Sequence, residues 1–120
     1  MPRVLIVEDD PDIRQVVAFV LADEGYEVDE AEEGQAALDL IAAQRPDVIL
    51  LDMKMPGMDG WDFARRYRER YNRDAPIIVI TAAPNAAERG EDVDAEGFVA
   101  KPFDLSVLVE RVAAAVGSRA

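Results

Sequence analysis

Short apolar runs alternate with longer amphipathic segments along this chain of 120 residues. Runs of three or four consecutive apolar residues predict strands buried on both faces, and one alternating segment predicts a half-exposed strand. Apolar residues spaced three and four positions apart predict helices with one buried face. The predicted strands cover residues 4–7, 26–29, 48–51, 77–80 and 98–100.

Polar and conformationally special residues mark the ends of the predicted helices. Asp10 followed by Pro11 is a typical N-cap and first helical residue, and Gly25 is a typical residue after a helix. Further helices are expected after Gly34, through residues 63–71 and after Asp104. Strands that alternate with helices favour a single α/β domain, residues 1–120, with a parallel sheet and helices on both faces.

Composition excludes several classes of function. The chain has 13 Lys and Arg against 25 Asp and Glu, a formal net charge of −12. This balance argues against direct nucleic-acid binding and against adhesion to anionic membranes. The absence of cysteine and histidine excludes disulfides and the thiolate and imidazole ligands of transition metals. No early apolar run is long enough for a signal peptide or membrane span, so we expect a cytoplasmic protein.

Polar residues follow four of the five predicted strands. Glu8 and Asp9 come after the first strand, Asp52 after the third, Thr81 after the fourth and Lys101 after the fifth. Parallel strands end at the same edge of a sheet, where ligands of such folds bind. Each residue alone has a simpler explanation, such as a helix N-cap, a loop residue or a solvated lysine. Their common position favours a site.

Three carboxylates at one edge require positive charge. Two carboxylates about 4 Å apart repel by about 4 kcal/mol at an effective dielectric constant near 20. Lys101 supplies one positive charge, and Mg²⁺ suits a set of oxygen ligands with positions left for water. A carboxylate beside Mg²⁺ and lysine is a competent nucleophile toward phosphorus, so Asp52 is a candidate for aspartyl phosphate formation.

Four segments of the chain match a known family in order and with nearly the usual spacing. They are VLIVEDDPDIR from residue 4, VILLDMKMPGMDGWDF from residue 48, VITAA from residue 79 and FVAKPF from residue 98. Together they resemble the receiver domain of two-component response regulators. The resemblance implies a doubly wound, flavodoxin-like sheet of five parallel strands in the order 2-1-3-4-5.

The resemblance also assigns roles to individual residues. It implies that Asp52 is the phosphoacceptor and that Mg²⁺ is the cofactor. The implied metal ligands are Glu8, Asp9, Asp52 and the backbone carbonyl of Lys54. The remaining implied roles are the switch hydroxyl of Thr81, the phosphate-pairing amine of Lys101 and the switch aromatic ring of Phe98. Phe98 lacks the hydroxyl of the tyrosine that is commoner there.

The function implied is a binding switch operated by phosphorylation. A sensor histidine kinase or a histidine phosphotransfer protein would donate the phosphoryl group, and the domain would catalyse its own phosphorylation and dephosphorylation. An output protein or domain would read the changed surface, and a homodimer could form through the fourth helix, fifth strand and fifth helix. No contact with nucleic acid or membrane is expected.

Two alternatives stay open. An aspartate-nucleophile phosphatase usually has a second acid two residues after the nucleophile, and here that residue is Lys54. A pseudo-receiver that serves only as a dimerisation module would not bind Mg²⁺, although every required functional group is present.

Three further features of the sequence lead to expectations about local structure. Residues 82–96 contain Pro84, Gly90 and several acids, which predict a short, weakly held fourth helix. The resemblance implies a cis peptide bond between Lys101 and Pro102. The arginine-rich segment 65–73 is expected to form a solvated, ion-paired helix face, and its aromatic residues are expected to pack.

Overall fold

The computed structural model describes residues 2–55, 57–72, 74–81, 95–101 and 104–117, with residue 81 described by its backbone alone. Two expectations therefore concern residues that are not described. The weakly held fourth helix falls in 82–96, of which only residues 95 and 96 are described, and the Lys101–Pro102 peptide bond includes residue 102.

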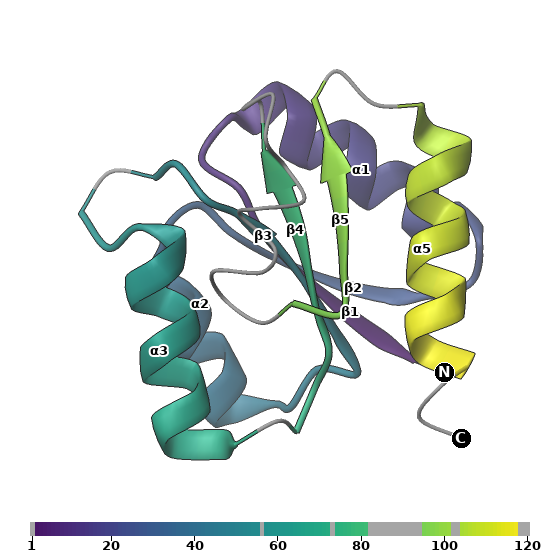
Figure 1. The fold of residues 1–120 in the computed structure, drawn as a ribbon. Helices are drawn as coiled ribbons and strands as arrows, with labels where there is room; N and C mark the ends of the chain where they lie inside the picture. The colour runs from purple at the N-terminus through teal and green to yellow at the C-terminus, as the bar shows by residue number, and fades with distance from the viewer. Residues whose placement is uncertain (1, 56, 73, 82–94, 102–103, 118–120) are drawn as a thin grey trace.

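Five parallel strands form one sheet in the order β2-β1-β3-β4-β5, which confirms the predicted fold class (Figure 1). Their bounds are β1 Arg3–Val7, β2 Glu27–Ala31, β3 Val48–Asp52, β4 Ile77–Thr81 and β5 Gly97–Ala100. The predicted strand 26–29 begins one residue early and ends two residues early. The reason is that β2 lies at the sheet edge, where pairing of Val7 with Ala31 extends it beyond its apolar residues.

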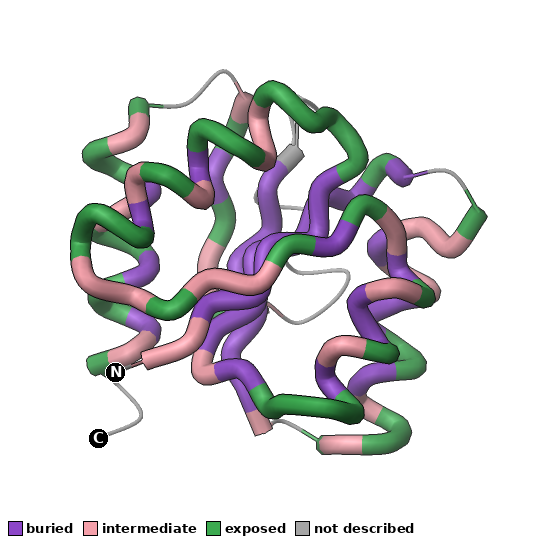
Figure 2. Tube along the Cα trace, turned by 180° about the vertical axis from the view of Figure 1, so that it is seen from behind, coloured by how far each residue is buried: buried purple, intermediate pink, exposed green. Residues whose placement is uncertain are grey.

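Helices cover both faces of the sheet (Figure 1). Helices α1 (Pro11–Asp23) and α5 (Leu105–Gly117) lie on one face, and α2 (Gly34–Ala43) and α3 (Gly60–Tyr71) lie on the other. Each face has its own apolar core, and the central strands contribute alternate residues to the two cores. Figure 2 shows the result as a continuous buried centre, in which all five residues of β3 are buried.

The predicted helix boundaries of α1 have a clear local cause. Asp10 is its N-cap, and the Asp10 carboxylate accepts hydrogen bonds from the backbone N–H groups of Asp12 and Ile13. Pro11 occupies the first helical position. Gly25 follows the helix with a φ of +100°, a conformation that side chains other than glycine rarely adopt.

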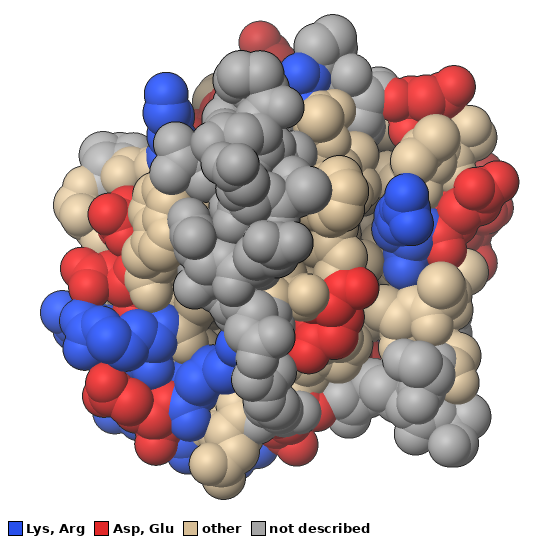
Figure 3. Space-filling view, viewed as in Figure 1, with Lys and Arg blue, Asp and Glu red and all other residues tan. Residues whose placement is uncertain are grey.

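The arginine-rich face of α3 is ion-paired, as expected. Arg65 pairs with Asp62 over 2.7 Å and with Glu69 over 3.3 Å, at the spacings that stabilise helices. Figure 3 shows Lys and Arg side chains interspersed with Asp and Glu side chains at the lower left of the molecule. In the described part of the chain, no helix is both long and apolar enough to cross a bilayer.

Tyr67 joins α3 to the segment that leads into β4. Its side chain is fully buried and its ring stacks on Phe63, with ring centroids 6.1 Å apart. The Tyr67 hydroxyl accepts a hydrogen bond of 2.9 Å from the backbone N–H of the buried Ala75. The aromatic residue therefore packs, as the sequence predicts, and it also satisfies a buried backbone donor.

We predict that Tyr67→Phe lowers the free energy of unfolding by about 1 to 3 kcal/mol, because the Ala75 N–H loses its acceptor in a buried place. Urea denaturation followed by circular dichroism measures the change. Tyr71→Phe is the matched control, since the Tyr71 hydroxyl makes no hydrogen bond among the described residues. Equal effects of the two substitutions would contradict a role for the buried hydrogen bond.

Candidate metal centre

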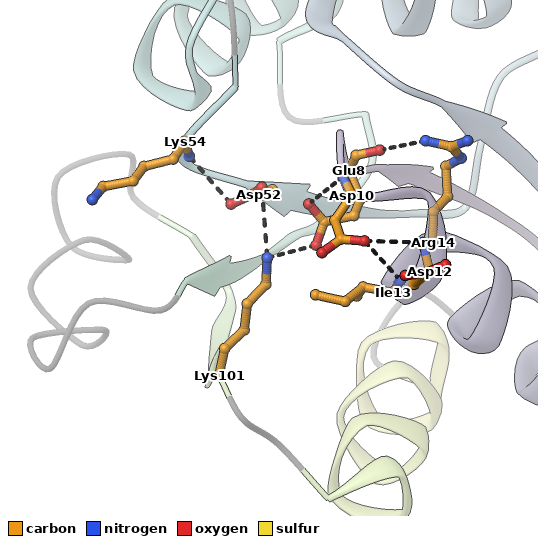
Figure 4. Close-up of polar contacts among 8 residues, drawn as sticks. All are labelled: Glu8, Asp10, Asp12, Ile13, Arg14, Asp52, Lys54 and Lys101. Atoms are coloured by element: carbon orange, nitrogen blue, oxygen red, sulfur yellow. Dashed lines mark hydrogen bonds and ion pairs between the residues drawn. The ribbon is translucent and has the colours of Figure 1, made fainter.

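The sheet brings the predicted site residues to one edge. Val7 pairs with Leu51, so the residues that follow them, Glu8 and Asp52, leave adjacent strands side by side. Oxygen atoms of Glu8, Asp9 and Asp52 all lie within 4.8 Å of one another. Lys101 directly follows β5 and reaches the same cluster (Figure 4).

Lys101 is held between the two buried carboxylates. Its Nζ atom lies 2.6 Å from Glu8 Oε1 and 3.6 Å from Asp52 Oδ2. Glu8 is fully buried and Asp52 is 4% exposed, and they are the two buried charged residues of the described chain. The shorter contact goes to Glu8, so in this arrangement the lysine is closest to the neighbouring acid rather than to the predicted phosphoacceptor.

The electrostatic environment disfavours the ionised form of Asp52. Burial and the adjacent Glu8 carboxylate raise the pKa of Asp52 to about 8, although Lys101 and the backbone N–H of Lys54 act in the opposite direction. Burial lowers the pKa of Lys101, but its close contact with Glu8 and the negative charge of Asp52 raise it overall above the ordinary value. One ammonium group therefore does not balance the cluster.

The donor set fits a divalent cation. Glu8 Oε1 is buried and faces the ammonium group of Lys101 over 2.6 Å. Asp9 is exposed and lines an open hollow of about 420 Å³. A site with three carboxylates, one of them facing solvent, offers oxygen ligands and leaves room for water, which is what Mg²⁺ requires. The hollow is lined by Asp9, Met53, Lys54, Met55, Asp59 and Trp61.

Lys54 contributes its backbone and not its side chain. Its N–H donates a hydrogen bond of 3.2 Å to Asp52 Oδ1, while its side chain is exposed and points away from Asp52 (Figure 4). The role of its carbonyl as a metal ligand stays a prediction.

Gly60 lets the first turn of α3 lie against the residues that follow the strand. A Cβ atom at this position would lie 2.7 Å from Met53 Cα and 3.1 Å from the backbone oxygen of Asp52. The Gly60 N–H also donates to the Met53 carbonyl over 3.1 Å. The glycine at the start of α3 therefore permits a close approach between two backbone segments, and it fixes the path of the chain beyond Asp52.

The two predicted switch residues lie on neighbouring strands. The backbone of Thr81 ends β4 and pairs with Ala100, next to Lys101. Phe98 lies in β5 and is 41% exposed.

Sequence reasoning missed Arg14, which donates a hydrogen bond from Nη1 to the backbone carbonyl of Glu8 over 3.0 Å. Its one signal in the sequence is its place in the first turn of a helix that begins beside the acidic pair.

Comparison with known proteins identifies the family. The model of the response regulator receiver domain matches residues 4–113. The response regulator MprA of Mycolicibacterium vanbaalenii is 41% identical over 114 residues, which are 93% of this chain and 49% of MprA. The chain thus spans about half the length of the curated relatives that it matches.

Comparison with solved structures supports the same family assignment. The chemotaxis protein CheY4 of Vibrio cholerae superimposes with a TM-score of 0.87 at 36% identity, over 96% of this chain and 98% of that one. The response regulator TrrA of Thermotoga maritima, solved in complex with Mg²⁺ and BeF, gives a TM-score of 0.83 at 37% identity, over 93% and 96% of the two chains. The chain belongs to the response regulator receiver domain family and is a signalling module of the two-component type.

We predict that Asp52→Asn raises the midpoint of thermal unfolding in buffer with a chelator. The folded state desolvates the Asp52 carboxyl group beside Glu8, and the amide removes that charge. Above pH 4 the unfolded carboxyl group is ionised, whereas the raised pKa keeps the folded group protonated to about pH 8. Wild-type stability therefore falls relative to the variant as pH rises through this window, and calorimetry at several pH values measures the difference.

The matched control is Glu110→Gln, which removes one negative charge from an exposed position of α5. Its effect on the unfolding midpoint should be small and nearly constant from pH 5 to pH 8. A wild-type advantage over Asp52→Asn that grows with pH would contradict the electrostatic interpretation.

Proposed function

We propose that this domain is a phosphorylation-dependent switch in which Asp52 accepts a phosphoryl group from a phosphohistidine of a partner protein, with Mg²⁺ as cofactor. The observation that carries the proposal is the buried pair of Glu8 and Asp52 with Lys101 between them at the carboxyl edge of the sheet. The family membership and the binding of Mg²⁺ and BeF by TrrA support it.

The proposed reaction is a transfer from nitrogen to oxygen. A carboxylate oxygen of Asp52 attacks the phosphorus, the bond between phosphorus and the imidazole nitrogen breaks, and the imidazole leaves with the electron pair and takes up a proton from solvent. The hydrogen bond from the Lys54 N–H to Oδ1 orients the carboxylate, which leaves Oδ2 on the side of Lys101. Mg²⁺ held by Glu8, Asp9, Asp52 and the Lys54 carbonyl would neutralise charge on the phosphoryl oxygens.

The switch would then act through Lys101, Thr81 and Phe98. Phosphoryl oxygens offer Lys101 a new partner, so its contacts with Glu8 and Asp52 rearrange, and the Thr81 hydroxyl moves toward the phosphoryl group. The half-exposed Phe98 ring follows inward, and the surface around β5 and α5 changes its affinity for partners. The partners proposed are a histidine kinase or histidine phosphotransfer protein, an output protein or domain, and a second copy through that same surface, all in the cytoplasm.

One observation disfavours the phosphatase alternative. The residue two positions after Asp52 is Lys54, whose side chain points away from the carboxylate and offers no acid there (Figure 4). In the proposed function, the domain catalyses its own phosphorylation and dephosphorylation and does not hydrolyse an external phosphomonoester.

We predict that the domain gains one phosphoryl group, about 80 Da, when it is incubated with phosphoramidate and Mg²⁺, because Asp52 lies among groups that stabilise charge on the phosphoryl oxygens. Intact-mass spectrometry measures the gain. Asp52→Asn and a chelator should each abolish it, while Glu110→Gln should leave it unchanged. The proposal is wrong if Asp52→Asn still gains the phosphoryl group, and rapid hydrolysis of p-nitrophenyl phosphate would favour the phosphatase.

We also predict that Asp9→Asn weakens Mg²⁺ binding more than Glu8→Gln does. Asp9 faces the hollow and is free to coordinate the ion directly, whereas Glu8 is committed to its contact with Lys101 and is expected to act through water. Trp61 lines the same hollow, so its fluorescence should report the titration. An equal effect of the two substitutions, or a larger one for Glu8→Gln, would contradict the assigned roles.

A further inference from the structure

The peptide group that joins Glu8 to Asp9 controls the position of the Asp9 side chain relative to that of Glu8. The orientation of its carbonyl sets ψ of Glu8, and with it the direction in which the chain runs on to Asp9. A change in ψ of Glu8 that φ of Asp9 does not offset would move the Asp9 carboxylate away from the carboxylates of Glu8 and Asp52. Something must therefore hold this peptide group, which lies just beyond the end of β1 and outside its ladder of hydrogen bonds.

Arg14 holds the carbonyl of that peptide group. Its Nη1 atom donates a hydrogen bond of 3.0 Å to the Glu8 carbonyl oxygen (Figure 4). Because side chains in a helix lean toward its N-terminus, a residue in the first turn of α1 can reach back over the loop to this oxygen. A donor with a full positive charge makes a stronger hydrogen bond than a neutral one.

The arginine is itself fixed at a second point. Its Nε atom lies 3.3 Å from the Glu30 carboxylate on β2, and its side chain is only 15% exposed. The neighbouring residue of β2, Ala31, accepts the Glu8 N–H over 3.0 Å. The backbone of Glu8 is therefore held at its N–H by the end of β2 and at its carbonyl by an arginine that is anchored to the same strand.

We propose that Arg14 is a positioning residue of the cation site, which fixes the peptide group between Glu8 and Asp9 so that the Asp9 carboxylate stays beside those of Glu8 and Asp52. The inference rests on the metal site of the proposed function. It assigns to a positively charged residue a favourable effect on cation binding, which is opposite to the effect of its charge alone. That opposition in sign makes the inference testable.

The test is the affinity for Mg²⁺, measured by isothermal titration calorimetry or Trp61 fluorescence well below the unfolding temperature. Loss of an outer partner of a metal ligand typically weakens binding 10- to 100-fold, so Arg14→Ala should bind Mg²⁺ about tenfold more weakly than wild type. Arg14→Lys keeps the charge and one donor, and its affinity should lie between the two. Arg111→Ala removes the same charge from an exposed position of α5 and should bind as wild type or slightly more tightly.

Tighter or unchanged binding by Arg14→Ala would overturn the inference, because charge removal alone predicts that result. A lowered unfolding midpoint with unchanged Mg²⁺ affinity would also overturn it and would assign Arg14 a structural role only. Failure of the wild-type chain to bind Mg²⁺ is a different result, since it removes the metal site itself. We expect the wild type to take up the phosphoryl group with Mg²⁺. We also expect Arg14→Ala to bind Mg²⁺ more weakly than wild type, while Arg111→Ala is not weakened.

Discussion

Two carboxylates, Glu8 and Asp52, are buried next to each other at the end of the sheet, and a single lysine lies between them. Like charges at such short range repel, and burial removes the water that would otherwise screen them. Lys101 offsets this cost only in part, because burial and the Glu8 carboxylate keep the pKa of Asp52 raised despite the lysine. The fold therefore leaves this cluster with more negative than positive charge, and a cation that bound there would supply the positive charge that is missing.

The rest of the fold holds that unfavourable arrangement in place. Strands β1 and β3 lie in the centre of the sheet and are enclosed by an apolar core on each face. The burial of those apolar side chains stabilises the sheet and offsets the cost of two poorly solvated acids. Because the strands are rigid, the carboxylates cannot move apart to relieve their repulsion. Close contacts at Gly60 restrict the segment after Asp52 in the same way.

The proposed binding and switching would follow from the same shortage of positive charge. Asp9, the third acid, is exposed at the hollow, so an ion could enter from solvent without opening the core. Lys101 lies closer to Glu8 than to Asp52, and a ligand that brings new oxygens can draw it away. A group that changes partners on a rigid strand end can transmit that change along β5 to the half-exposed Phe98.

The sequence by itself determined the strands, the helix caps and the chemical character of the sheet edge. Periodicity shows whether a position is buried, and residues such as Asp10 and Gly25 act on backbone atoms only a few positions away. The order of the strands and the roles of single residues came from resemblance to a family. The tertiary structure alone decided the contacts between distant residues: Lys101 with Glu8, the hydroxyl of Tyr67 with the start of β4, and Arg14 between the acidic loop and β2. Apolar patterns specify that a side chain is buried but not which partner it meets, because the partner depends on how strands and helices from separate parts of the chain pack together.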